Sequence, residues 1–229
     1  MNINTLNIDI KNNIKDYIIF KPKNKDELKK AVDLWCSELA TKKVLNYYGH
    51  ISNWNTSLIY DMSNLFRSKF KFNEDISNWD VSSVTNMNSM FHHAFSFNQP
   101  LDSWNVSSVI DMHAMFLAAF SFNQSLDSWN VSSVITMSSM FEEASVFNQP
   151  IDSWDVSSVT SMKSMFYEAT HFNQPLNSWN VSSVTDMSYM FYDASLFKQK
   201  LDSWDISNVE NKSNIVKNAL SFNKHGSPW

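Results

Sequence analysis

Glycine is nearly absent from this chain of 229 residues, which contains only Gly49 and Gly226. Its tight turns must therefore be made by Asn, Asp, Ser and Pro, which favour turn conformations through local hydrogen bonds or a fixed φ. The lack of glycine between these two positions also excludes a glycine-rich phosphate-binding loop there. Cys36 is the single cysteine, so no internal disulfide can form, and a reducing compartment is expected.

Long apolar runs are missing as well, and the longest ones are far shorter than a membrane span. Residues 1–20 lack the apolar core of a signal peptide and a cysteine for lipid attachment. We therefore expect no membrane insertion and, by default, an intracellular location. The net charge of −5 gives no reason to expect a nucleic-acid partner.

In place of these features the chain has a repeat of 25 residues. Trp104 begins the phrase WNVSSVIDMHAMFLAA, which is followed by FNQ at Phe122, and the phrase recurs along the chain without insertions. A fixed period of this length indicates units that stack on one another. We predict a buried spine of stacked indole rings from the tryptophans at this spacing, Trp79, Trp104, Trp129, Trp154, Trp179 and Trp204.

Each unit is expected to contain a short strand and a helix. Leu101, Trp104 and Val106 alternate with polar residues, which is typical of a strand with one buried face. From Val109 to Phe122 the apolar residues are spaced by three or one, which predicts a helix of about three turns, with Ser108 as its N-cap. Because helices are wider than strands, a stack of such units should curve into a horseshoe.

The chain is therefore predicted to be an α/β fold, a right-handed solenoid of β-strand/α-helix coils with a helical cap. Residues 1–50 would hold a leader, with a short strand at 16–20, and a capping helix from Asn24 or Lys25 to about Leu45. Residues 51–229 would form the solenoid, with regular coils at about 73–200. Charged residues such as Lys69 and Lys212 stand at core positions of the two end coils, which predicts capping coils there, and Trp229 could seal the last one.

The offsets of Leu101, Trp104 and Val106 match the leucine-rich-repeat signature L-x-x-L-x-L, with Trp in the second Leu position. The longer phrase W-[ND]-V-S-S-V-x-x-M-x-x-M-F-x-x-A-x-x-F-N-Q-P resembles that of the BspA-like leucine-rich-repeat surface proteins, a repeat domain of mycoplasma-type lipoproteins. The resemblance covers about residues 50–222. It implies a solenoid without catalytic activity and a role in adhesion or protein binding.

No constellation of residues predicts catalysis, a metal or a cofactor. The histidines do not align on adjacent coils, and the serines recur identically in every coil, which is typical of turn caps and not of nucleophiles. Asp102, Asp127 and Asp152 share one position on consecutive coils and form a stack of carboxylates. Two interpretations of this stack remain open. Each carboxylate either caps its own turn, which we favour, or the stack binds a cation such as calcium. The stack of Asn98, Asn123, Asn148 and Asn173 is expected to be a structural amide ladder.

Side chains that differ between otherwise identical coils are not required by the coil, so they are the candidates for binding. Some of these aromatic side chains should be exposed, and exposed aromatic patches indicate partner surfaces; Phe95 and Phe120 could equally pack into a seam between neighbouring helices. The candidate binding residues are Phe95, Leu117, Phe120, Tyr167 and Tyr192.

The sequence thus predicts a non-enzymatic repeat scaffold for protein–protein interaction or adhesion, with a protein partner that it does not identify. Exposed ends of the solenoid would also permit end-to-end self-association. The alternative is a protein that binds a regular lattice, such as a glycan polymer or ice, through the uniform face made by Ser103, Asn105, Ser107 and their equivalents.

Overall fold

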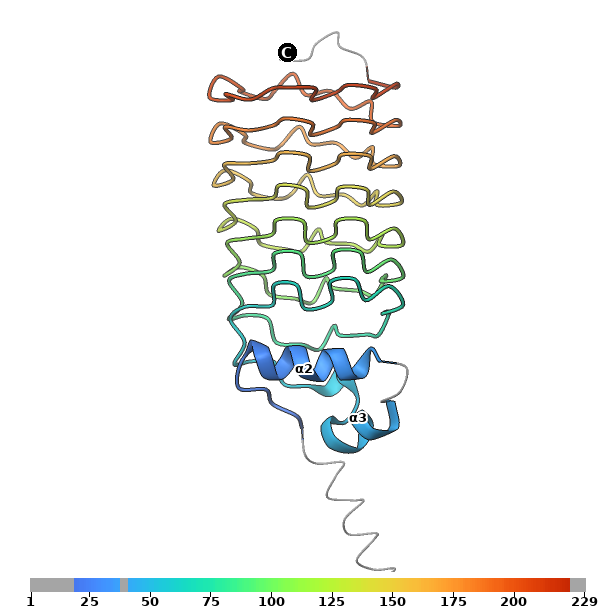
Figure 1. Cartoon of the computed structure of the whole chain (residues 1–229). Helices are drawn as coiled ribbons and strands as arrows, with labels where there is room; N and C mark the ends of the chain where they lie inside the picture. The colour runs from blue at the N-terminus through green and yellow to red at the C-terminus, as the bar shows by residue number, and fades with distance from the viewer. Residues whose placement is uncertain (1–18, 38–40, 223–229) are drawn as a thin grey trace, which may run out of the picture.

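The repeats form a straight column of stacked coils, with helix α2 (Lys25–Trp35) lying across the N-terminal end (Figure 1). The structure, a computed structural model, describes residues 19–37 and 41–222. Each coil is one repeat of 25 residues, and six parallel bridges join successive coils. We number the coils from the first, residues 51–75, to the seventh, which begins at residue 201 and is described to residue 222.

The expected α/β architecture is wrong. Within the described ranges there is no extended strand, and the helical elements are α2 (Lys25–Trp35), α3 (Thr41–Tyr48) and the short 3₁₀ turn η1 (Ile51–Asn53), all of which precede Trp54. The bridges between coils are isolated ones, at a single position of the repeat: Asp61, Asn86, Asp111, Thr136, Ser161, Asp186 and Asn211. Without helices on one side to spread the coils, the column does not curve into the predicted horseshoe (Figure 1).

Consecutive β-turns produce the spacing that predicted a helix. In the third coil, hydrogen bonds close turns from Met112 to Met115 and from Phe116 to Ala119. A turn returns the chain to the interior after three residues, so it places apolar residues three or four apart as a helix does. The predicted strand is likewise replaced by turns, because Trp104 N–H donates to the carbonyl of Leu101 at 3.1 Å, and Val109 N–H to that of Val106 at 2.9 Å.

Two turns of each coil place a residue other than glycine in the left-handed region. Ala114 has φ 52° and Ala118 has φ 53°, and each is the third residue of its turn, as in a type II turn. The same two positions of every coil have positive φ, including Ser139, Glu143 and Tyr189. Glycine is the residue that usually takes this conformation, and a side chain there costs on the order of 1 kcal/mol. These turns give the front of the column its stepped outline in Figure 1.

The stepped segment carries most of the hydrogen bonds between coils. The N–H groups of Met112, Ala114, Phe116 and Ala118 donate to carbonyls of the fourth coil over distances of 2.7–3.2 Å. At the preceding corner the direction reverses, since Ile135 N–H of the fourth coil donates to the carbonyl of Ile110 in the third at 2.9 Å. The equivalent bonds recur between other neighbouring coils, so each coil supplies the backbone partners of the next.

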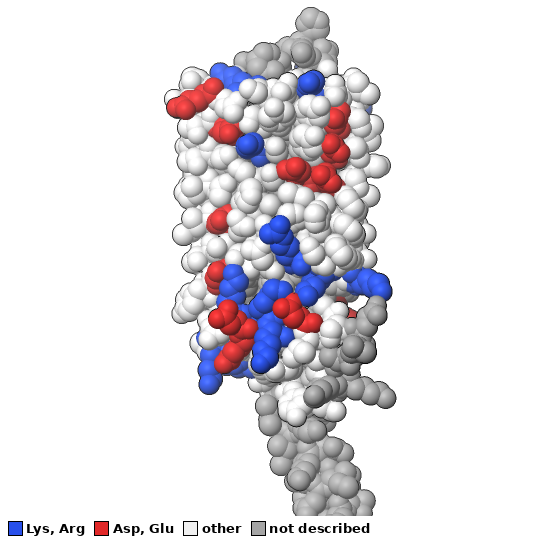
Figure 2. All heavy atoms as spheres, in the orientation of Figure 1, with Lys and Arg blue, Asp and Glu red and all other residues white. Residues whose placement is uncertain are grey.

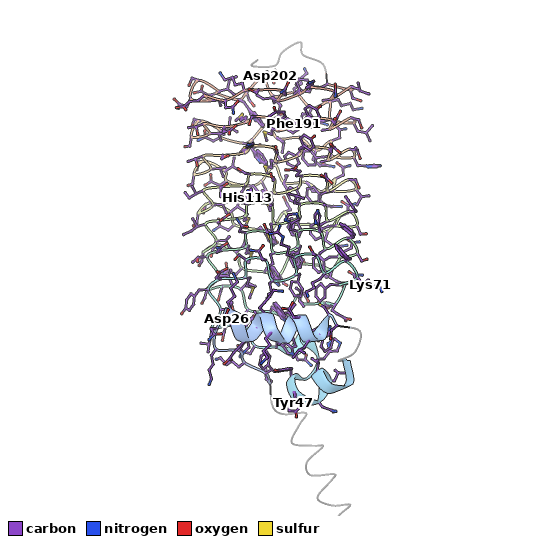
Figure 3. All side chains as sticks on the ribbon, viewed as in Figure 1. Asp26, Tyr47, Lys71, His113, Phe191 and Asp202 are labelled. Atoms are coloured by element: carbon purple, nitrogen blue, oxygen red, sulfur yellow. The ribbon has the colours of Figure 1, made fainter. Side chains whose placement is uncertain are left out.

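Aromatic side chains fill the interior. The six tryptophans of the predicted spine are 2–4 % exposed, and each indole N–H donates to a carbonyl 28 residues earlier, over 2.8–3.2 Å. Trp129 and Trp154 stack with ring centroids 6.4 Å apart. Two buried columns of phenylalanine run beside them, so that Phe116 contacts Phe122 of its own coil at 4.1 Å and Phe141 of the next at 5.6 Å. In Figure 3 the labelled Phe191 belongs to one of these columns.

The N-terminal segment covers the first coil. Helix α2 starts where the sequence predicts, because the Asn24 side chain accepts from the N–H of Glu27 at 3.0 Å. It ends at Trp35 and does not continue to Leu45, so the prediction of one long helix is wrong. The hydroxyl and N–H of Ser37 both bond the carbonyl of Leu34, which closes the helix. The strand expected at 16–20 lies mostly outside the described residues, and Ile19 and Phe20 are not in a strand.

Apolar contacts and ion pairs hold this cap in place. Leu28, Ala31 and Val32 are fully buried, and the Trp35 ring lies edge-on to that of Trp54, 6.1 Å between centroids. Lys25 Nζ lies 2.9 Å from Asp61 of the first coil, and Lys69 Nζ lies 2.7 Å from Asp33 of α2. Lys69, the charge at a core position in the first coil, is therefore paired with the cap.

The seventh coil is less buried than the coils before it. Lys212 is exposed where other coils have a buried methionine, and Val216 is half-buried where they have phenylalanine. Ile215 and Ala219 stay buried, while Leu220 is 85 % exposed. Lys212 thus stands at a position of the repeat that faces solvent in the last coil. Trp229, which the sequence suggested as a seal, lies outside the described residues.

The indole hydrogen bond and the packing of the ring can be separated by two substitutions. Trp129→Ala should lower the free energy of unfolding by about 3–5 kcal/mol, because it leaves a cavity. Trp129→Phe keeps a ring but leaves the carbonyl of Leu101 without its donor, so we expect a loss of about 1–3 kcal/mol. Urea unfolding followed by circular dichroism measures both, with the exposed Ser133→Ala as control. A change below about 1 kcal/mol for Trp129→Ala would contradict the role of the spine.

The strain in the turns predicts that one glycine substitution is stabilising. Glu143 has φ 57°, so Glu143→Gly should remove strain and raise the free energy of unfolding by up to about 1 kcal/mol. Lys163 is exposed and is the second residue of the turn from Met162 to Met165, a position without positive φ. Lys163→Gly should therefore lower the free energy of unfolding by about 0.5–1 kcal/mol. Thermal unfolding of the two variants should give shifts of opposite sign, and shifts of the same sign would refute the assignment of strain.

Candidate functional site

Three phenylalanines form an exposed row along the side of the column. Phe70, Phe95 and Phe120 stand at one position of the first three coils, with successive ring centroids 4.8 Å apart and the rings stacked. Phe70 is 51 % exposed and Phe120 40 %, and Phe95 between them is half-buried. The alternative that Phe95 and Phe120 pack into a seam between helices is excluded, because beyond η1 the coils contain no helices in the described ranges. We call these three residues the phenylalanine row.

The next coils show that the coil does not need an aromatic residue there. Ser145, Thr170 and Ser195 occupy the same position in the fourth to sixth coils. The phenylalanine row is therefore an apolar surface patch confined to the N-terminal half of the column, of the kind that marks a contact surface. Phe70 was missing from the sequence prediction, although it stands 25 residues before Phe95 and the period alone identifies it.

The predicted tyrosines form a second, separate patch. Tyr167 and Tyr192 of the fifth and sixth coils stack with centroids 4.9 Å apart and an interplanar angle of 6°. Both are half-buried, and Lys217 Nζ lies 5.7 Å from the centre of the Tyr192 ring. Tyr189 of the sixth coil, which the prediction omitted, lies 5.9 Å from Tyr192. The five predicted residues therefore do not form a single site.

Leu117 is half-buried and stands at the same position of the repeat as Tyr167 and Tyr192. We call this position the Leu117 column. Its side chains change in charge along the molecule: Arg67, His92, Leu117, Glu142, Tyr167, Tyr192 and Lys217, from the first coil to the seventh. The following position, which has positive φ, carries Ser68, His93, Ala118, Glu143, Glu168, Asp193 and Asn218.

The charges on these two positions raise or lower the pKa of neighbouring groups. Burial raises the pKa of Glu142, and the carboxylates of Glu143 and Glu168 add to this, against a hydrogen bond from Ser139. Burial, followed by a hydrogen bond to Glu168, raises the pKa of Tyr167 to about 12. The acidic part of this surface thus lacks compensating positive charge: no ion pair of the described residues involves Glu142, Glu143 or Glu168.

Two coils towards the N-terminus, the charges around the corresponding residue, His92, are positive. Burial lowers the pKa of His92 to about 4, and the positive charges of His93, Arg67 and His113 add to this. The Nδ1 atom of His92 is buried and has no hydrogen-bond partner among the described residues. Figure 2 shows basic side chains over the N-terminal part of this face, mixed with the acidic ones around α2, and a group of acidic side chains over its C-terminal half.

The aspartate stack is bonded to neighbouring serines. Asp127 Oδ1 accepts from the Ser153 hydroxyl at 2.6 Å, and the two carboxylate oxygens of Asp152 accept from the N–H and hydroxyl of Ser178, both at 2.9 Å. These donors come from the next coil, so Asp127 and Asp152 link neighbouring coils, and the expectation that they cap their own turns is wrong. Across the described residues, no three His, Cys, Asp or Glu side chains lie together as a metal site requires.

The asparagine stack is a structural ladder, as predicted. The Asn98 Oδ1 atom accepts from the N–H of Asn123 at 3.0 Å and from the side chain of Gln124 at 2.9 Å. The same pair of bonds joins the next coils, where Asn123 Oδ1 accepts from Asn148 at 3.0 Å and from Gln149 at 3.0 Å. The amide oxygens of these asparagines therefore have partners within the column.

A groove of about 1000 Å³ lies at the N-terminal end, between α3 and the first coil. Its wall includes Tyr47 of α3, which is 74 % exposed and is labelled in Figure 3. It also includes His50 and Ser52, but the Nδ1 atom of His50 caps η1 by bonding both the N–H and the hydroxyl of Ser52. Cys36 lies elsewhere, at the end of α2, and burial raises the pKa of its thiol to about 11, so the thiol stays protonated at neutral pH.

One protein family matches most of the chain. The family described as "Mycoplasma protein of unknown function, DUF285" matches residues 37–149 and again residues 125–229. The chain belongs to this family. The two DUF285 matches overlap over one period of the repeat and together span the seven coils. No curated protein and no solved structure matches the chain. In the part of this DUF285 chain that the structure describes, neither helix has the length and apolarity to cross a bilayer.

The raised pKa of Glu142 predicts a pH-dependent gain from its removal. A carboxyl group with a raised pKa in the folded state lowers stability as pH rises above its ordinary value of 4.5, and this penalty is complete above the folded pKa. Glu142→Gln should therefore raise the unfolding temperature at pH 7 and leave it unchanged near pH 3. The exposed Glu210→Gln serves as control. A lower unfolding temperature of Glu142→Gln at pH 7 would show that the Glu142 carboxylate does not destabilise the fold.

Proposed function

We propose that the chain is a non-enzymatic scaffold that binds a protein partner through the side of its column. The observation that carries this proposal is the phenylalanine row, in which two rings are 51 % and 40 % exposed although neighbouring coils have Ser or Thr there. Exposed aromatic side chains on a rigid surface provide large contact areas at little entropic cost. Stacking aligns the three rings along one side of the column, so a partner can cover them together.

The same proposal extends to a place among the BspA-like leucine-rich-repeat surface proteins and to a role in adhesion. It is supported by the phrase of the repeat and by a surface that varies while the core does not. The core positions of the regular coils repeat, whereas the Leu117 column changes from Arg to His, Leu, Glu and Tyr. A repeat scaffold binds through such variable positions.

The alternative, a regular-lattice binder of a glycan polymer or ice, has less support. Its predicted face is occupied by internal hydrogen bonds: the Ser103 hydroxyl donates to the carbonyl of Ser77 at 2.9 Å, and that of Ser107 to Asn105 Oδ1 at 2.7 Å. A lattice would have to replace these bonds. The groups that the lattice should bind thus already have partners.

A triple substitution tests the proposal. Phe70→Ser, Phe95→Ser and Phe120→Ser together give the first three coils the residue found in the fourth and sixth, so the column should fold normally. We expect this variant to lose at least about tenfold in affinity for a protein partner, since each buried aromatic contributes about 1–2 kcal/mol. The measurement is affinity capture with the purified chain, followed by titration of each captured protein.

The matched control is Ile110→Thr with Ile135→Thr. These two residues are 48 % and 43 % exposed on another edge, and the coils on either side have threonine there. The control variant should retain the partner. Equal binding by the wild type and the triple variant would remove the phenylalanine row from consideration.

A further inference from the structure

The Leu117 column has a symmetry that the repeat does not require. Counting one and two coils from Leu117 towards the N-terminus gives His92 and Arg67, and the same counts towards the C-terminus give Glu142 and Tyr167. The adjacent position adds His93 on one side and Glu143 and Glu168 on the other. The surface is therefore basic or imidazole-bearing on one side of Leu117 and acidic on the other, with the half-buried, apolar Leu117 in the centre.

A surface of this kind is complementary to itself. A two-fold axis that lies in the plane of this face, at right angles to the column axis, and passes through Leu117 would place Leu117 against the same residue of a second copy. It would bring Arg67 of one copy to Tyr167 and Glu168 of the other, and His92 to Glu142, and each contact would occur twice. We propose that two copies of this chain associate antiparallel through this face, with Leu117 on the two-fold axis.

Each charged group would gain in the dimer what it lacks in the single chain. Arg67 is exposed and its guanidinium bonds only Asn64 Oδ1, at 3.2 Å, among the described residues. Across the axis it could pair with Glu168 and lie over the Tyr167 ring. The carboxylates of Glu142 and Glu143, which have no ion pair among the described residues, would meet His92 and His93.

The charge shifts on the two sides of Leu117 agree with this arrangement. Burial is the main cause of the lowered pKa of His92 and of the raised pKa of Glu142. The positive neighbours of His92 and the carboxylates next to Glu142 add to these shifts, so these charges disfavour the charged form of each group. An antiparallel partner brings the opposite field to each. A parallel partner would place Glu142 against Glu142 and His92 against His92. Charge therefore selects the antiparallel orientation.

The contact is small. Five coils about 4.8 Å apart extend roughly 24 Å along the column, so a strip two or three side chains wide buries roughly 500 Å² on each copy. This is at the lower end for specific association and predicts dissociation constants in the micromolar range. The proposal does not depend on the phenylalanine row, because it uses other residues.

Sedimentation equilibrium of the full chain at about 10–200 µM and low salt tests the proposal. We expect a species of twice the chain mass of 26.5 kDa, which weakens as salt is added. Leu117→Arg should abolish it, because the new charge meets itself on the axis. Arg67 and Lys217 occupy the same position in other coils, so the substituted coil should fold. A wild type that stays monomeric at about 200 µM would overturn the proposal.

Two charge reversals supply the decisive experiment. Arg67→Glu and Glu168→Arg should each weaken the homodimer at least about tenfold, since each reversal creates two like-charge contacts. Mixed together, the two variants should form a heterodimer more stable than either homodimer. In the heterodimer the carboxylate introduced by Arg67→Glu faces the guanidinium introduced by Glu168→Arg. This contact therefore again joins a positive and a negative group, with their positions exchanged. The other contact keeps the wild-type pair of Arg67 and Glu168, and a general loss of folding cannot give this recovery.

The control is Lys200→Glu, an exposed reversal at a position outside the Leu117 column. It should leave the dimer within about twofold of the wild type. If the mixture of the two reversed variants stays monomeric, or if Leu117→Arg dimerises like the wild type, the chain associates through another surface or not at all. Either result refutes the arrangement.

Discussion

Hydrogen bonds between the backbones of adjacent coils are the constraint on which this structure depends. The N–H groups at four alternate positions of a coil, such as those of Met112 and Ala114, have partners only in the next coil. To aim all four in one direction, the chain must turn twice through the left-handed region, at Ala114 and Ala118. The strain of those turns is offset because a buried N–H without a partner would cost more. A single coil could not satisfy its own backbone.

The aromatic core follows from this stacking. Coils joined at this distance bring equivalent side chains over one another, so flat rings at one position form columns, as Phe116 and Phe141 do. Tryptophan adds a further link, because its indole N–H satisfies a carbonyl of a neighbouring coil, as Trp129 does for Leu101. Core and backbone are thus two parts of one repeated contact, which explains why the core positions hardly vary.

Much of this organisation could be predicted from the period of the repeat and from local capping signals. The stacking of coils, the asparagine ladder and the start of α2 at Asn24 are as the sequence indicated. The content of each coil was not predictable from apolar spacing, because successive β-turns and a helix place residues such as Met112, Met115 and Phe116 on the inside alike. The near absence of glycine pointed away from left-handed turns, yet Ala, Ser and Glu adopt them here. The surface was harder to predict. The period identifies Phe70 but not the stacking of its ring on that of Phe95. The period also does not show that the phenylalanines and the tyrosines form two separate patches.

The cap at one end gives the column a polarity. Helix α2 and its ion pairs cover the first coil, whereas the seventh coil leaves Val216 half-buried and Leu220 open to water. Because each coil is held mainly by its neighbours, loss of order should start at the weaker end and advance coil by coil towards α2. Under tension along its axis such a molecule would unfold one coil at a time and release a similar length of chain at each step.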